Sequence, residues 1–248
     1  GNLPNTEVFI NAAIAWGFAL WLRAEIGRRI NAGRWASIGI IFAIGSLYKH
    51  IALVPTVCLG AMELIFPPAN TPRRTILIHL AIIFATVAVA WASVFGYFMA
   101  TSRGWLIWQT LVVAPRAYAG GLTANIAAAF EPSHLFAAEL GFAIPAIALA
   151  LFGALIGFRS VPPRAWRLLI ALAIGMQLAV ALPGGFAEHY YQLWFVPLAI
   201  AAGWGAAGVV DRVRIRWLAR AAISLVAIAV LLPQLSWYTL DADQWAWR

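Results

Sequence analysis

The stretch WASIGIIFAIGSLYKHIALVPTVCLGAMELIF, residues 35–66, decides how the chain is arranged. It is largely apolar, and its most polar segment is the triplet Tyr48-Lys49-His50 near the middle. Two interpretations fit the pattern: two short helices joined by a turn at the triplet, or one long helix kinked near Pro55. The choice matters because it reverses the direction of every helix that follows.

The composition places the chain in a membrane. Of its 248 residues 63% are hydrophobic and 10% are charged, and the mean hydropathy is +0.85. Soluble domains carry about 25% charged residues, so this chain cannot cover itself with a water-facing surface. The net charge of +8 does not indicate a nucleic-acid partner, because the arginines form short clusters between apolar runs. Such clusters orient membrane proteins.

The apolar residues form long continuous runs without the period of two that marks a membrane β-barrel. Continuous runs predict helices, since a helix satisfies its own backbone in lipid. We therefore expect an all-α integral membrane protein, a single multi-span domain over 1–248 with about eight transmembrane or membrane-embedded helices. The runs are 8–22, 35–48, 51–66, 76–100, 135–158, 168–182, 190–210 and 221–235.

The distribution of positive charge separates the two interpretations of residues 35–66. With two helices and an extracytoplasmic start, the cytoplasmic loops hold 13 of the 17 basic residues, as the positive-inside rule expects. With one helix the basic residues divide almost evenly and Lys49 stays in the membrane. Two helices are therefore predicted, with both termini extracytoplasmic. The 13 are Arg23, Arg28, Arg29, Arg34, Arg73, Arg74, Arg159, Arg164, Arg167, Arg212, Arg214, Arg216 and Arg220.

Lys49 is the first candidate for a ligand contact. It follows a short apolar run, and His50 comes next to it. One interpretation is a lysine that snorkels to the interface. The other is a cation that binds a lipid phosphate at the outer leaflet, which a compact ammonium suits. Glu7, at the start of the first run, is either an acid that favours the helix dipole or a group that faces the same outer cavity.

The segment EHYYQ, residues 188–192, is unusually polar for the edge of an apolar run. An aromatic belt at the interface accounts for Tyr190 and Tyr191. It does not account for Glu188, His189 and Gln192. On an α-helix Glu188, Tyr191 and Gln192 share one face, which could hydrogen-bond a sugar or a phosphate. Anchoring and ligand binding both remain open here.

The segment 101–134 is the longest polar region on the outer side. Trp105 and Trp108 are one helical turn apart, which suits a helix lying in the interface. Arg116 follows in the same segment. It either covers a cavity as a further phosphate contact or faces lipid.

Other ionisable residues are weaker candidates. Glu63 and Glu139 lie within apolar runs, where charged groups usually face the bundle interior or water. His79 is expected to be structural. No metal-binding or cofactor motif is evident, and the close acids Asp241 and Asp243 are a weak signal.

The order of these elements resembles the GT-C glycosyltransferases that use polyprenyl-phosphate sugars, the group of protein O-mannosyltransferases and lipid A aminoarabinose transferases. In that family a TE pair starts a mid-chain span, a hairpin containing lysine and proline follows, and a later span begins with His-Tyr before Pro-Leu. The likeness covers the later part of the family's architecture. The residues that carry it here are Thr6, Glu7, Gly45, Lys49, Pro55, His189, Tyr190, Tyr191 and Pro197.

The resemblance implies a transferase in a bacterial cytoplasmic membrane. It would move a sugar from a polyprenyl phosphate to an acceptor on the extracytoplasmic face, with Lys49 and Arg116 stabilising the departing phosphate. The family's catalytic acid lies in its first outer loop, upstream of any segment present here. We therefore expect this chain to be a fragment that is inactive alone. The sugar, the acceptor and any divalent metal are not indicated.

Two other classes remain. A transporter or flippase would explain many spans with polar groups on one face, but it predicts ionisable groups near mid-membrane and related halves. A non-catalytic subunit of an envelope assembly needs no chemistry at all. An outer cavity that joins Lys49 to residues 188–192 would favour the transferase.

Overall fold

The computed structural model describes residues 6–24, 31–135, 144–157, 161–184, 186 and 188–212, with short pieces between 217 and 228. Over these residues the chain is helical and contains no strand, which confirms the all-α prediction for the described part. Asp241, Asp243, Glu139 and most of the run 221–235 lie outside them. The α-helices are α1 (Thr6–Arg23), α2 (Ala32–Tyr48), α3 (Leu53–Ile65), α4 (Arg73–Ala100), α5 (Gly104–Trp108), α6 (Ala114–Tyr118), α7 (Leu122–Ala128), α8 (Pro132–Leu135), α9 (Ile144–Gly157), α10 (Pro163–Ala181) and α11 (Phe195–Arg212).

The membrane prediction is borne out at a coarse level. Among the described residues three helical segments are long and apolar enough to cross a membrane: 73–100, 163–181 and 190–212. Three shorter apolar helices, over 9–23, 32–48 and 50–65, match the first three predicted runs. A helix shorter than about 20 residues needs shielding by neighbours or polar flanks to span the hydrocarbon core.

Residues 35–66 form two helices, as the distribution of charge predicts. The first, α2, ends at Tyr48, and Lys49 is extended with φ −160° and ψ 122°. A single 3₁₀ turn, η1 (His50–Ala52), leads into α3. Pro55 lies in the first turn of α3, where its missing N–H leaves no intrahelical bond unmade. The alternative of one kinked helix is therefore wrong.

The core lies where α1, α2, α3 and α10 meet. Fully buried side chains such as Ile14, Phe18 and Leu59 fill it. A Cβ on Gly175 of α10 would lie 2.6 Å from the Cα of Pro55, so α3 and α10 touch through their backbones. Small residues let helices approach closely, which matters in lipid because lipid offers no hydrophobic driving force between helices.

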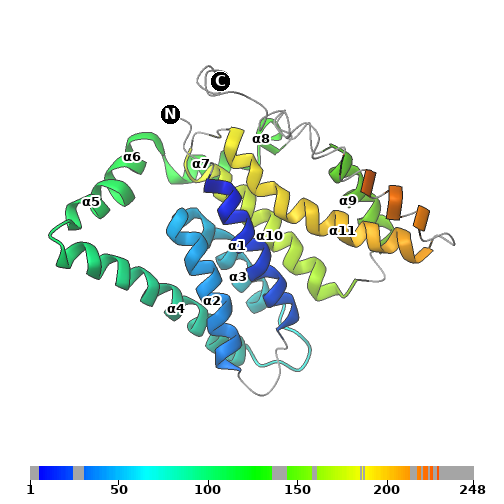
Figure 1. Cartoon of the computed structure of the whole chain (residues 1–248), viewed down its shortest axis with the longest axis horizontal. Helices are drawn as coiled ribbons and strands as arrows, with labels where there is room; N and C mark the ends of the chain where they lie inside the picture. Colours follow the sequence, from blue (N-terminus) through cyan, green and yellow to red (C-terminus); the bar gives the residue numbers. More distant parts are fainter. Residues whose placement is uncertain are drawn as a thin grey trace.

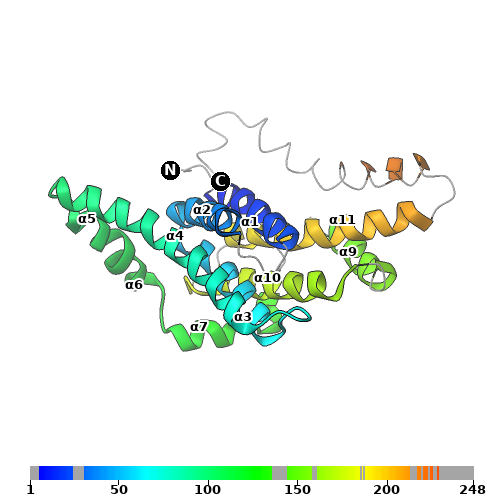
Figure 2. The same cartoon turned by 90° about the horizontal axis from the view of Figure 1, so that it is seen from below.

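Two extensions leave this bundle (Figure 1). On one side α4 leads into α5 and α6, and both views show these helices as an arm beside the bundle (Figure 2). On the other side α11 packs along α9, where a Cβ on Gly153 would clash with the Cα of Gly205. The arm and the α9–α11 pair thus flank the helices that hold the polar clusters.

The segment that was predicted to lie in the interface is helical and forms part of the arm. Residues 104–118 form α5, a π-helical segment η2 (Gln109–Val113) and α6 in succession. Pro115 explains the irregularity, since its ring and missing N–H disturb the regular bonding of the preceding turn. Trp105 and Trp108 are 63% and 59% exposed, as expected for side chains that contact lipid.

Candidate functional site

Glu7 and Lys49 meet at one end of the bundle, here called the Lys49 end. Glu7 lies in the first turn of α1 and is 1% exposed. Lys49 caps the C-terminus of α2, and its Nζ lies 2.7 Å from Oε1 of Glu7. Each charge has the sign that its helix end favours, an acid at an N-terminus and a cation at a C-terminus. The position of the pair is thus set by both helices.

Tyr190 completes this group from a distant part of the chain. Its ring centroid is 4.0 Å from Lys49 Nζ, a cation–π contact. Tyr190 and Tyr191 belong to a 3₁₀ segment, η4 (Glu188–Trp194), and are 8% and 3% exposed. Three of the residues predicted from the sequence, Glu7, Lys49 and Tyr190, therefore form one cluster, here called the Lys49 cluster.

Neighbouring contacts fix the elements that carry this cluster. Asn11 of α1 donates its side-chain N–H to the carbonyl of Gln192 at 2.7 Å, which ties α1 to η4. Phe9 and Tyr48 stack with ring centroids 5.2 Å apart, which ties α1 to α2. The three segments are thus joined pairwise around the charges.

The remaining predicted residues are less closely placed. The side chains of Glu188 and His189 lie outside the described part of the chain. Because η4 is a 3₁₀ helix with three residues per turn, the α-helical spacing on which the shared face was predicted does not hold in this segment. Arg116 is exposed on α6 in the arm.

His50 is partly exposed beside Lys49. Partial burial, and then the neighbouring positive charge of Lys49, lower the pKa of His50 below its ordinary value. The lowered pKa favours the neutral imidazole of His50 at neutral pH. The cation at this turn is Lys49.

The sequence did not single out Gln177 or Asn125, which connect the segment 101–134 to the bundle. Gln177 of α10, 1% exposed, donates to the carbonyl of Ala129 at 2.6 Å and accepts the indole N–H of Trp194 at 2.8 Å. Asn125 of α7 donates to the carbonyls of Ala119 and Leu182. A single amide within the apolar run 168–182 was the available signal for Gln177.

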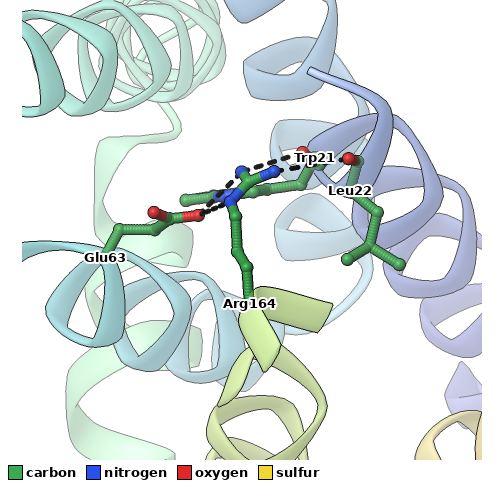
Figure 3. A network of polar contacts seen from close by, with 4 residues as sticks. All are labelled: Trp21, Leu22, Glu63 and Arg164. Atoms are coloured by element: carbon green, nitrogen blue, oxygen red, sulfur yellow. Dashed lines mark hydrogen bonds and ion pairs between the residues drawn. The ribbon is translucent and has the colours of Figure 1, made fainter. Parts of the chain in front are cut away.

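A second charge pair occupies the opposite end of the bundle, here called the Arg164 end (Figure 3). Both Nε and Nη2 of Arg164 contact Oε1 of Glu63, at 2.8 and 2.7 Å. The guanidinium also donates to the carbonyls of Leu22 and Trp21, each at 3.4 Å. Glu63 is 2% exposed, which agrees with the expectation that it faces the interior. The pair joins α3 to α10, and the guanidinium also bonds to carbonyls of the last turn of α1.

His79 has the structural surroundings expected of it. Its ring is 1% exposed and stacks on Trp35 with centroids 4.3 Å apart. Within the described residues no group of three or more His, Cys, Asp or Glu side chains could hold a metal ion. The site to be interpreted is therefore the Lys49 cluster, built from one cation, one carboxylate and one phenol ring.

Function has to be inferred from this geometry. No family model, no curated protein and no solved structure matches the chain.

Proposed function

We propose that the chain is part of a membrane glycosyltransferase that moves a sugar from a polyprenyl-phosphate donor to an acceptor on the extracytoplasmic face. The observation that carries the proposal is the Lys49 cluster. Its three members come from α1, the α2–α3 turn and η4, and each was singled out from the sequence alone. They are also among the residues that carry the likeness to GT-C enzymes.

Lys49 is suited to bind the phosphate of the donor. Its ammonium has three N–H groups, of which one donates to Glu7. The Tyr190 ring covers a second side, and the side chain keeps 23% of its surface exposed. Glu7 holds the lysine in place through this contact. A phosphate oxygen can then accept from the exposed side of the ammonium in a charge-assisted hydrogen bond.

The reaction would be a direct displacement at the anomeric carbon. The bond from that carbon to the phosphate oxygen breaks as a bond to the acceptor oxygen forms, and a base takes the proton of the acceptor hydroxyl. Lys49 stabilises the negative charge that develops on the departing lipid phosphate. Among the described residues none is assigned as this base.

The proposed topology puts the Lys49 end outside the cell and the Arg164 end inside. Both termini would then be extracytoplasmic, with about eight membrane-embedded helices in one domain of a bacterial cytoplasmic membrane. The described arginines that begin or end helices at the Arg164 end support this orientation through the positive-inside rule. They are Arg23, Arg34, Arg73, Arg74, Arg164 and Arg167.

The packing of the described bundle argues against the competing interpretation as a transporter. Between the two charge pairs the bundle is filled by Ile14, Phe18 and Leu59, which are at most 1% exposed. A donor site needs access from one side only, which this packing allows.

The test is binding of a radiolabelled polyprenyl-phosphate sugar to the purified chain in nanodiscs. We expect saturable binding that falls at least about tenfold in Lys49→Ala, since a lost charge-assisted contact is worth roughly 1.5–3 kcal/mol. Arg103→Ala is the matched control, because it removes an exposed cation outside the Lys49 cluster. Absence of saturable binding by the unsubstituted chain, or equal binding by Lys49→Ala, would refute the donor site.

A further inference from the structure

The Arg164 end holds a cavity that the proposed function does not use. It measures about 330 Å³ and lies where α1, α10 and α11 approach one another. Five of its wall residues are apolar or small, and the sixth is a guanidinium. The wall consists of Leu22, Val161, Pro162, Arg164, Ala165 and Trp204, and we call it the Arg164 cleft.

Arg164 keeps hydrogen-bonding capacity toward this cleft. Two of its five N–H groups point at Glu63 with short distances, 2.7 and 2.8 Å. The remaining contacts, to the carbonyls of Leu22 and Trp21, are 3.4 Å long and so near the limit of a hydrogen bond. The side chain is 23% exposed. An anionic oxygen could therefore replace these long contacts with shorter, charge-assisted bonds.

The surroundings of the cleft define which anion fits. Glu63 balances the charge of Arg164, and Arg167, one turn further along α10 and outside the wall of the cleft, has its guanidinium carbon 5.7 Å from the centroid of the Phe66 ring. Trp204 forms an apolar wall whose position is set by its edge-to-face contact with Trp166 at 5.1 Å. A free phosphate would gain little from such apolar walls. A phospholipid gains from both the guanidinium and the apolar walls, because its phosphate is adjacent to its glycerol and acyl carbons.

We infer that the Arg164 cleft binds the head group of an anionic phospholipid, with the phosphate on Arg164 and the adjoining carbons against Trp204 and Leu22. This site lies at the opposite end of the bundle from the Lys49 cluster, so it is independent of the proposed transferase function. Bound there, the lipid joins α1, α10 and α11 at the end where those helices meet.

The test uses the full chain in detergent, titrated with phosphatidylglycerol and with phosphatidylcholine, and counts bound lipids by native mass spectrometry. Ala165→Phe fills the cleft and leaves the ion pair intact, and Ala92→Phe adds the same ring at an exposed position of α4 as control. We expect one tightly held phosphatidylglycerol, bound about tenfold more weakly by Ala165→Phe and normally by Ala92→Phe.

A second variant separates lipid binding from folding. Arg164→Gln with Glu63→Gln removes both charges together, so no buried charge is left unpaired. We expect this double variant to keep its helical content and to lose the preference for phosphatidylglycerol over phosphatidylcholine. Equal lipid binding by the unsubstituted chain, Ala165→Phe and the double variant would overturn the inference, as would equal binding of the two lipids by the unsubstituted chain.

Discussion

The two ends of the bundle carry charge pairs with nearly the same geometry and different surroundings. In each pair nitrogen and oxygen are 2.7 Å apart, the acid side chain is 2% exposed and the basic side chain is 23% exposed. At one end the cation is a lysine beside an aromatic ring. At the other it is an arginine that bridges a carboxylate and the carbonyls at the end of α1.

The difference shows that distance and burial do not define what an ion pair does. The planar guanidinium of Arg164 donates to three acceptors on two helices, α1 and α3. The pair is therefore a structural link. Lys49 is a compact charge with one carboxylate partner in the cluster and an open side. The lysine pair therefore offers a ligand the open side of its cation, whereas the arginine pair holds helices together and has only its two long carbonyl contacts to exchange for the proposed lipid phosphate.

The largest expected effect comes from breaking the structural pair. Arg164→Ala leaves Glu63 as a buried carboxylate without its cation, which should lower the stability by about 3–5 kcal/mol. Chemical unfolding in detergent, followed by circular dichroism, measures the change. Adding Glu63→Gln to Arg164→Ala should recover part of the loss, because it removes the unpaired charge. A single variant as stable as the unsubstituted chain would mean that Arg164 is not a structural link.

Breaking the other pair should cost less stability. Lys49→Ala also leaves a buried acid, but Glu7 lies in the first turn of α1, where free backbone N–H groups and the helix dipole favour a carboxylate. We expect a loss of about 1–2 kcal/mol by the same unfolding measurement. If Lys49→Ala destabilises the chain as much as Arg164→Ala, the two pairs do not differ as argued here.

The aromatic ring should contribute a smaller share of donor binding. Replacing Tyr190 by Leu removes the ring face next to Lys49, a contact worth about 0.5–2 kcal/mol, so donor affinity should fall roughly two- to thirtyfold. Tyr190→Phe keeps the ring and is the matched control. Equal losses in both variants would assign the effect to the phenol hydroxyl instead of the ring.

The smallest effect is a dependence on pH through His50. Because its pKa is lowered in the folded chain, the unfolded chain binds more protons in that range, and stability falls as the pH drops below about 6.5. Between pH 7 and pH 5 the unfolding midpoint of His50→Gln should change less than that of the unsubstituted chain. If the midpoint of His50→Gln changes with pH as much as that of the unsubstituted chain, His50 is not the cause of the pH dependence.

Sequence reasoning found the first three helices and all three residues of the Lys49 cluster for physical reasons. The turn at Lys49 was predictable because charge and hydropathy both change there. The 3₁₀ form of η4 was not, since helix type in a short segment depends on the packing around it. The bonds of Gln177 were also hidden, because its partners include the backbone carbonyl of Ala129, which leaves no mark in the sequence.

The cluster at Lys49 also has a consequence for the order in which the chain is made. Glu7 and Lys49 are synthesised well before Tyr190, which supplies the ring face of the lysine. Because synthesis proceeds from the N-terminus, the charge pair can form while the ligand-binding surface is still incomplete. Under the proposed function, full affinity for the donor would then appear only when η4 docks against α1, after the charge pair has formed.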